Sequence, residues 1–462
     1  MRVSPRIASL LLLTAAAGCR PAPAHGPLTL AAEAPAQPVS LLRLARAGGK
    51  PALYRFPSLK PSAWVGREAL PAIRRPLGAD LDGRLVYVLD TKDNVAALDL
   101  ESGRQRPVLP NVAAAAVGPD GTLYAVAQDR TVTEVADRSP LVFPGKLSAL
   151  PVRLFGGGDE TVLALLGGKT PTLAVADRQQ PPTEHPVPAG EATTTNWGNI
   201  VAIAADSAVV VVTPASAHPY RTLEAGPHVR QVLFSPSGHR LYAARDGADE
   251  LTVFDRFTWS KIDPVPLPGA PRAIRADPLG RFLLVRPATG DSVWVLDLST
   301  NELLGTWGAP WSDDLPAIAG SRFLVLRQGQ DVVTYDLASA KLPETGRVPG
   351  GAADLWLILD WAPRGEALAG ASADTAALVA ADTAAESRVF VQVSSSQNPA
   401  WADELARKLS RAGLPASVIK PEHPDEGYRV VLGPYPSREA AESTGKRLGQ
   451  PYFIYTPDLP GR

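Results

Sequence analysis

Amide, hydroxyl and guanidinium side chains recur at alternate positions near the end of the chain. Residues 389–393 alternate valine with Phe390 and Gln392, so if the valines face a core, Phe390, Gln392 and Ser394 share the opposite face. Arg429 joins them from a later strand. Gln392 offers two donors and an acceptor, and Arg429 offers a fixed fork of donors, which suits sugar hydroxyls and N-acetyl groups. In an arbitrary strand the same residues would simply be solvated.

The elements that would position these side chains follow the order β-α-β-β-α-β. A helix follows the strand 389–393; it opens at Asn398-Pro399, an amide-bearing cap with proline at the first helical position, and stops at Gly413. Apolar residues three or four apart mark one face of this helix, namely Ala402, Leu405, Ala406, Leu409 and Ala412. Two strands, a second helix and a fourth strand complete the unit, at 416–419, 428–432, 437–449 and 452–455.

Four sequence motifs of this unit resemble those of the SPOR domain, a small bacterial module that binds peptidoglycan. They occur in the family's order, at 390–395, 409–415, 428–435 and 437–441. The resemblance implies that the sheet face without helices forms a shallow groove for glycan strands stripped of their peptide stems. It implies peptidoglycan-binding residues at Phe390, Gln392, Ser394, Ser395, Arg429, Tyr452 and Ile454. The family usually has glycine, serine and an aromatic residue after the first strand, whereas this chain has three serines, Ser394-Ser395-Ser396.

The other end of the chain has the pattern of a secretion signal. A short basic region, 1–6, precedes an apolar stretch, 7–17, which is too short to span a bilayer as a stable anchor. Ala16-Ala17-Gly18-Cys19 then resembles the bacterial lipobox, whose cysteine is lipidated and becomes the first residue of the mature protein. The alternative is an ordinary secretory signal cut after Ala15-Ala16-Ala17.

We expect lipidation at Cys19, because it is the only cysteine of the chain and a lone thiol in an exported protein is otherwise unexplained. A signal peptide at 1–18 and a lipid-anchored mature protein follow from this interpretation. At the position after the cysteine, an aspartate commonly signals retention in the inner membrane, and this chain has Arg20 instead. We therefore expect the protein to be anchored in the outer membrane and to face the periplasm.

Composition limits the remaining possibilities. The 462 residues exceed one ordinary domain, and a hydrophobic content of 45% can bury a large core. A net charge of −1 gives no electrostatic reason to expect nucleic acid as a partner. We expect residues 19–50, which are rich in proline and alanine, to form an extended tether.

From residue 51 to 375 the chain repeats itself with a period near 40 residues. A turn with glycine, aspartate or asparagine leads into an apolar strand whose first residue recurs at Arg84, Thr122, Thr161, Ile200, Arg240, Arg281 and Arg322. A second strand follows each of these. Four short strands per unit predict a β-propeller, whose radial stacking shields strand edges. The repeats resemble the YVTN or WD40-like propeller group.

An eighth, partial repeat at 355–371 lacks outer strands of its own. Residues 52–56 and 64–65 resemble the missing strands, so the two ends of the repeat region would share a blade and close the ring. We therefore expect eight blades, with seven as the alternative. A linker at 376–387 and the SPOR-like unit at 388–457 complete a multidomain fold: an all-β propeller followed by a small α+β domain.

Aspartates recur where the third strand of each repeat ends, at Asp99, Asp177, Asp255, Asp297 and Asp336. We expect them to bond to backbone amides of the following turn rather than to form a metal or catalytic set. The six histidines show no ligand spacing, and no nucleophile elbow, phosphate-binding loop or zinc pattern occurs. We expect no catalytic residue, no metal site and no cofactor.

Together these features predict a non-catalytic lipoprotein of the cell envelope. It would bind peptidoglycan glycan strands that lack stem peptides, at the division septum, while the propeller docks an unknown envelope protein. One alternative is a propeller hydrolase or lyase acting on envelope carbohydrate, since propellers bring active-site residues together from different blades. The other is a structural spacer between outer membrane and wall.

Overall fold

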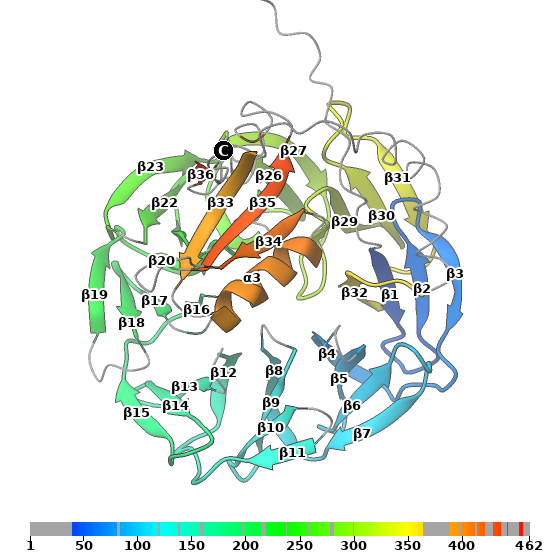
Figure 1. Ribbon diagram of the computed structural model, residues 1–462, viewed down its shortest axis with the longest axis horizontal. Coiled ribbons are helices and arrows are strands. Elements are labelled where there is room, and N and C mark those ends of the chain that lie inside the picture. Colours follow the sequence, from blue (N-terminus) through cyan, green and yellow to red (C-terminus); the bar gives the residue numbers. More distant parts are fainter. Residues whose placement is uncertain are drawn as a thin grey trace, which may run out of the picture. The chain divides into compact units, whose positions relative to one another are not determined.

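Nine four-stranded antiparallel sheets make up the described part of the chain. The computed structural model describes residues 39–363 and 389–455, apart from gaps at 81–83, 119–120, 137–138, 158–160, 196–197, 199, 214–218, 237, 257, 278–280, 299, 397–398, 412–413, 421–427, 436–440 and 442–451. Eight of the sheets belong to residues 39–363 and are arranged as blades around a common centre (Figure 1). This confirms the propeller and the count of eight blades.

Seven blades each consist of four consecutive strands, and the first strand of each lies nearest the centre (Figure 1). Their strands are β4 (Ile73–Asp80), β5 (Leu85–Asp90), β6 (Val95–Asp99), β7 (Gln105–Leu109); β8 (Val112–Val117), β9 (Leu123–Ala127), β10 (Val132–Ala136), β11 (Ser139–Val142); β12 (Pro151–Gly156), β13 (Val162–Leu166), β14 (Thr172–Ala176), β15 (Thr183–Pro186); β16 (Ala192–Thr194), β17 (Val201–Ala205), β18 (Ala208–Val212), β19 (Pro219–Glu224); β20 (Val229–Phe234), β21 (Arg240–Arg245), β22 (Glu250–Asp255), β23 (Lys261–Pro266); β24 (Pro271–Ala276), β25 (Phe282–Pro287), β26 (Ser292–Asp297), β27 (Glu302–Gly308); β28 (Ala317–Ala319), β29 (Phe323–Gln328), β30 (Asp331–Asp336) and β31 (Glu344–Val348).

The recurring strand starts are confirmed to within one residue, and they are the second strands of their blades. These strands are almost continuously apolar because both of their faces are covered by neighbouring blades. β5 is buried along its whole length, and β13 likewise. The cores therefore lie between blades, as a series of apolar clusters that each join residues of two adjacent sheets.

The eighth blade joins the two ends of the repeat region, as predicted. It contains β1 (Ser40–Leu44), β2 (Ala52–Arg55) and β3 (Lys60–Val65), and its innermost strand is β32 (Leu355–Leu359). β1 lies within the segment 19–50 that was expected to be a tether, so the propeller begins earlier than residue 51. The physical reason is that Leu41, Leu42 and Leu44 are 0% exposed and pack between blades. Residues 364–371 of the expected eighth repeat and the linker at 376–387 lie outside the described residues.

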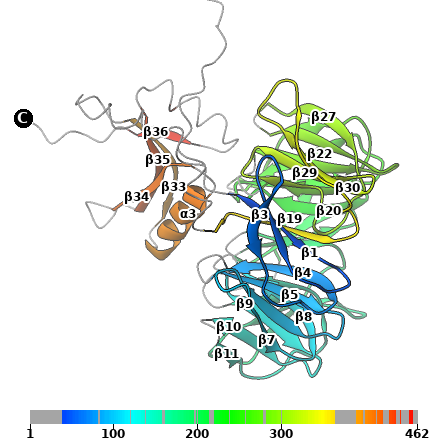
Figure 2. The ribbon, with the colours of Figure 1, turned by 90° about the vertical axis from the view of Figure 1, so that its right-hand side faces the viewer.

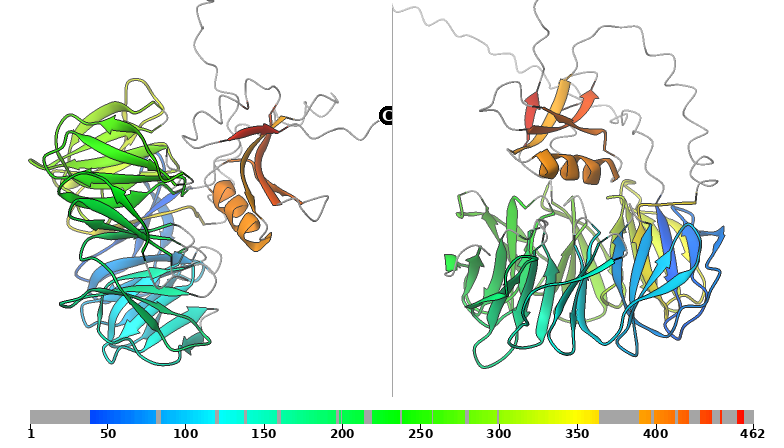
Figure 3. Two further views of the ribbon diagram at one scale, coloured as in Figure 1. Left: turned by 90° about the vertical axis from the view of Figure 1, so that its left-hand side faces the viewer. Right: turned by 60° about the horizontal axis from the view of Figure 1, so that its bottom comes forward.

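The ninth sheet belongs to the carboxy-terminal part, whose strands are β33 (Val389–Ser396), β34 (Ala416–Ile419), β35 (Tyr428–Tyr435) and β36 (Phe453–Tyr455). Its strand order is β34-β35-β33-β36. The helix α3 (Pro399–Arg411) lies along one face of this sheet (Figure 2), and Figure 3 shows the same helix and sheet from two other directions. Of the predicted second helix, 437–449, the structure describes Ala441 alone, which is helical and buried in the core of this domain.

Candidate functional site

The first half of β33 alternates as predicted. Val389, Val391 and Val393 are almost fully buried and pack with Ala402, Ala406 and Leu409 of α3. Phe390 and Gln392 are half-buried, and the alternation of a strand places them on the face opposite α3. We call this surface, with its residues on β33 and β35, the open face.

β35 contributes the second row of the open face. Gln392 is paired with Val431, and Arg429 lies two residues from Val431, so all three share one side of the sheet. Val430 and Leu432 point the other way and belong to the core with α3. The half-buried Arg429 thus lies on the same face as Gln392, one strand away and displaced along it. An amide and a guanidinium are therefore brought together as the sequence predicted.

Ser394 does not follow the predicted alternation. The register of β33 and β35 shifts between Gln392 and Ser394, so that Ser394 is paired with the core residue Val430. Such a shift is a β-bulge, in which one extra residue displaces the side chains beyond it by one position. The placement of Ser394 on the open face is therefore wrong. Ser395 is paired with Arg429, so it occupies the register position that was expected for Ser394.

Tyr452 and Ile454 also differ from the prediction. Both pack against the core under α3, and Ile454 is paired with Val391. Phe453 is paired with Gln392, and the next pair along joins Tyr455 to Phe390. A one-residue error in register moves every side chain of a strand to the other face, and this error assigned Tyr452 and Ile454 to the wrong side. The sequence of residues 452–455 is compatible with either set of side chains facing the core. Only the pairing with β33 decides which set does.

A close approach of two aromatic rings to the backbone at Gly433 was not predicted. Gly433 has a φ of +129°, and a Cβ atom there would lie 3.1 Å from a ring carbon of Phe390 and 3.1 Å from one of Tyr435. Both the backbone angle and the close approach require glycine. Gly433 therefore lets the rings of Phe390 and Tyr435 lie close to the backbone of β35, and of these two only Phe390 belongs to the open face.

The propeller contains a cavity of about 410 Å³ where the innermost strands β4, β24, β28 and β32 of four successive blades meet. Leu77, Ile318 and Leu357 are among its apolar lining residues. Its charged lining residues are Arg275, Asp313, Asp314 and Asp360. Such a lining is suited to a polar ligand only if these charges are not already used by the protein itself.

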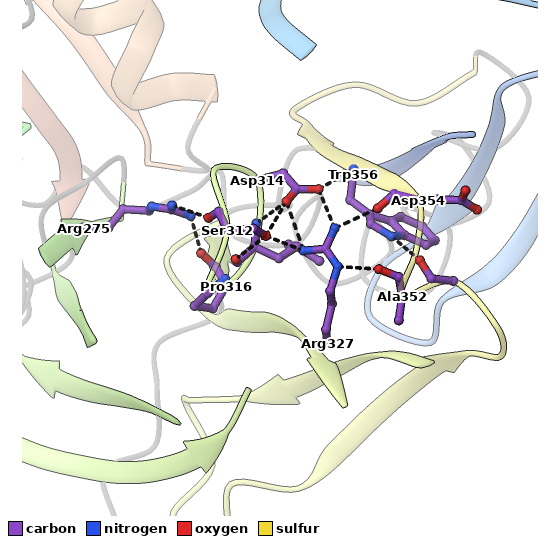
Figure 4. A network of polar contacts seen from close by, with 10 residues as sticks. Arg275, Ser312, Asp314, Pro316, Arg327, Ala352, Asp354 and Trp356 are labelled. Carbon is purple, nitrogen blue, oxygen red and sulfur yellow. Dashed lines mark hydrogen bonds and ion pairs between the residues drawn. The ribbon is translucent and has the colours of Figure 1, made fainter. Parts of the chain in front are cut away.

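Asp314 is used by the protein itself, as the centre of a polar network (Figure 4). It accepts hydrogen bonds from Arg327 at 2.8 and 3.0 Å, from the Ser312 hydroxyl at 2.8 Å and from the Trp356 backbone N–H at 2.9 Å. The side chains of Asp314 and Arg327 are only 4% and 8% exposed. Burial alone would raise the pKa of the Asp314 carboxyl, but the hydrogen bonds, first among them those from Arg327, outweigh it and hold that pKa below 3.8.

Two arginines extend this network to the neighbouring blades. Arg327 of β29 donates to the carbonyl oxygens of Ala352 and Asp354, at 2.7 and 2.8 Å, just before β32 begins. Arg275 of β24 donates to two carbonyl oxygens of the loop 312–316, at 2.6 and 2.7 Å. The network therefore joins three successive blades across the seam at which the ring closes (Figure 4).

Four of the five recurring aspartates bond to turn amides among the described residues, as predicted. Asp99, Asp177, Asp255 and Asp336 each accept hydrogen bonds from backbone N–H groups two or three residues further along. Asp297 forms an ion pair with Arg281 at 4.0 Å. Among the residues that the structure describes, no group of three or more histidine, cysteine, aspartate or glutamate side chains could hold a metal ion.

We expect acid to destabilise the propeller by protonating carboxylates that accept hydrogen bonds in the folded state. Asp336 illustrates the sign: burial would raise its pKa, but Arg322 and the Ala338 N–H lower it below the unfolded value of 3.8. The resulting stabilisation is fully present above the unfolded pKa and is lost as pH falls below about 4 and through the lower folded pKa. Denaturant titrations across this range should show a shallower loss of unfolding free energy in Asp336→Asn than in the wild type. Parallel curves would contradict the assignment.

The expected signal peptide at 1–18, Cys19 and most of the expected tether lie outside the described residues. None of the helices in the described part of the chain has the length and apolar character needed to cross a membrane.

Comparison with known families identifies the carboxy-terminal part. Residues 385–454 match the SPOR domain family. This match indicates peptidoglycan binding by the domain and a protein of the cell envelope on its periplasmic side. No curated protein is significantly similar to the chain in sequence.

Comparison with solved structures supports the propeller fold of the region that precedes the SPOR domain. A dihydro-heme d1 dehydrogenase, NirN, solved in complex with DHE, is similar with a TM-score of 0.52 and 14% identity, over 69% of this chain and 74% of that one. AztD from Citrobacter koseri is similar with a TM-score of 0.53 and 11% identity, over 70% of this chain and 98% of that one. At such identities the likeness concerns the fold alone, and both relatives are β-propellers. The chain thus combines an eight-bladed β-propeller with a SPOR domain at residues 385–454.

Proposed function

We propose that this chain is a lipoprotein of the cell envelope that binds peptidoglycan glycan strands lacking stem peptides, at the division septum. The observation that carries the proposal is the open face, where Gln392 and Arg429 lie on adjacent strands and Phe390 lies two residues from Gln392 on the same face. Amide and guanidinium donors suit sugar hydroxyls and N-acetyl groups, and the Phe390 ring suits the flat side of a sugar. The SPOR match supports the same ligand.

Sedimentation with purified cell walls tests this function. The purified chain is expected to pellet with sacculi whose stem peptides have been removed by an amidase, and to pellet less with intact sacculi, because stems obstruct access to the glycan. Equal pelleting with both, or none with either, would exclude recognition of stem-free glycan.

Lipidation at Cys19 is expected to hold the protein at the outer membrane, since an anchor with more than one acyl chain binds a bilayer stably. Cys19→Ala should move the protein from the membrane fraction to the soluble periplasmic fraction and abolish incorporation of a labelled fatty acid. Thr14→Ser, within the apolar stretch, is the matched control and should leave both unchanged. Membrane retention of the Cys19→Ala protein would reject the anchor.

We assign the propeller the role of a docking platform for another envelope protein. Two of the four charged lining residues of its cavity support this role over catalysis, because Asp314 and Arg275 are committed to joining blades. If substitutions on the propeller surface change neither the position of the protein in the cell nor the proteins that bind it, the propeller is instead a structural spacer.

The cavity is also the observation that favours a second candidate function, a hydrolase or lyase acting on envelope carbohydrate. Asp313 and Asp360 are its other acidic lining residues, and glycoside cleavage commonly uses two carboxyl groups. If this function holds, Asp313→Asn and Asp360→Asn should each abolish release of soluble glycan fragments, whereas Asp206→Asn, at an exposed site elsewhere, should not. Absence of any fragment release by the wild type would remove this candidate.

A further inference from the structure

Both connections to the propeller join it at a single point of the closing blade. β1 begins at Ser40, β32 ends at Leu359, and these two residues are paired directly with one another. The chain that precedes the propeller and the chain that follows it therefore attach at the same end of one short antiparallel ladder. Figure 1 shows β1 and β32 side by side at this place.

This arrangement decides how tension between the two ends of the chain would act. When antiparallel strands are pulled apart at the same end, their paired residues separate one after another instead of sharing the load. The first pairs to separate would be Ser40 with Leu359, then Leu41 with Ile358, then Leu42 with Leu357. β1 is also paired with β2, whereas β32 is an edge strand with β1 as its neighbour in the sheet. The strand that peels away is therefore β32.

The two ends of β32 are held very differently. The end that would be pulled, Leu357–Leu359, is apolar and is held by backbone pairing and side-chain packing. The other end is held by charge: the Trp356 N–H donates to Asp314 at 2.9 Å, and Arg43 of β1 donates to Asp354 at 2.5 Å.

Further contacts fix the same end of the strand. The Trp356 ring is 1% exposed, and its indole N–H donates to the Gly351 carbonyl at 2.8 Å. Arg327 holds the two carbonyls of Ala352 and Asp354 while it is itself paired with Asp314. A strand that peels from Leu359 thus meets, at Trp356, a group of buried charged hydrogen bonds that must break before it can go further.

We propose that β32 and this network form a tension-limiting closure of the propeller. Under tension residues 357–363 peel first, and the contacts of Asp314 with Arg327 and Trp356 stop the peeling and keep the ring closed. The proposal rests on the proposed function only for the source of the tension, which would be a membrane anchor before the propeller and a wall-bound SPOR domain after it.

Single-molecule force measurement on the full chain tests the proposal. In protein produced without export, so that Cys19 keeps a free thiol, Cys19 provides one attachment point and Ser372→Cys provides the other, and the SPOR domain hangs free of the force. Peeling of residues 357–363 should appear as a reversible low-force step of at most about 25 Å, the extended length of seven residues at about 3.5 Å each, less the distance that they already span. A separate step at higher force should mark the loss of the stop.

Variants identify which contacts form the stop. Asp314→Asn is expected to shorten the lifetime of the partly peeled state at constant force at least tenfold, because it leaves the buried Arg327 without its carboxylate partner. Asp354→Asn, which removes only the bond with Arg43, should shorten it less and serves if Asp314→Asn fails to fold. Arg347→Gln is the matched control, because it removes a guanidinium from the outermost strand β31 of the neighbouring blade and should leave the lifetime unchanged.

Two results would overturn the proposal. One is a single opening step in the wild type with no partly peeled state, and the other is the same lifetime in the wild type and in the Asp314 and Asp354 variants. The measurement involves neither membrane nor glycan, so a failure of glycan binding would leave its outcome unaffected.

Discussion

Replacing Asp314 by asparagine is expected to lower the free energy of unfolding of the propeller by about 3–5 kcal/mol, the usual effect of breaking a buried ion pair by removing one partner. Asp314 and Arg327 are almost fully buried, and asparagine would leave the Arg327 guanidinium without a negative partner in the protein interior. The change also weakens the bond to the Trp356 N–H, which links the closing strand β32 to the preceding blade. Chemical denaturation of the full chain measures the effect.

A surface ion pair provides the control for this prediction. Asp246 accepts two hydrogen bonds from Arg230 at a site where both side chains are largely exposed. Because solvent screens exposed pairs, Asp246→Asn should cost far less stability than Asp314→Asn. A double replacement, Asp314→Leu with Arg327→Met, should recover only part of the loss, because it removes both buried charges but leaves the Trp356 N–H and the carbonyls of Ala352 and Asp354 without these partners. Equal losses at Asp314 and Asp246 would contradict a structural role for the buried pair.

Arg429→Ala is expected to weaken binding of the chain to stem-free glycan strands by roughly 10- to 100-fold, since a hydrogen bond from a charged donor contributes about 1.5–3 kcal/mol. Gln392→Ala removes neutral hydrogen bonds and should have a smaller effect in the same direction. The residues lie on adjacent strands of one face and would contact the same glycan, so the double variant should bind more weakly than either single variant. Dissociation constants from titration of the full chain provide the measurement.

Arg407→Ala is the matched control for the open face. Arg407 belongs to α3, where it pairs with Glu404 at 2.9 Å on the opposite side of the domain. Removing it deletes the same charge from the same domain without touching the open face, so binding should remain unchanged. If Arg407→Ala weakens binding as much as Arg429→Ala, general charge attraction and not the open face accounts for the affinity.

The propeller was predictable because each blade repeats the same physical solution. The second strand of a blade is covered on both faces, which makes it a run of apolar residues such as Leu85–Leu89, and the turn before it needs glycine, aspartate or asparagine. The closure of the ring was predictable because the eighth repeat lacks outer strands of its own and the start of the repeat region supplies matching ones. The strand β1 was missed because it has five residues beside a segment rich in proline and alanine, and its burial depends on partners more than 300 residues away in the sequence.

The candidate site was predicted less completely, and the reasons are local. Gln392 and Arg429 follow from simple alternation on paired strands. The bulge that moves Ser394 out of this row depends on how β33 and β35 fit together, which no single strand reveals. Tyr452 and Ile454 were assigned to the wrong side because a strand of alternating apolar residues is compatible with either face. The network around Asp314 joins residues far apart in the sequence, and no spacing marks it.

The central claim is that the open face binds peptidoglycan glycan, and calorimetric titration tests it most directly. Purified glycan strands of defined length, with and without peptide stems, are titrated into the wild-type chain under identical conditions. Saturable binding of the stem-free strands, with weaker binding of the strands that carry stems, is the predicted result. No heat of binding with stem-free strands, or identical affinity for both ligands, would contradict the claim.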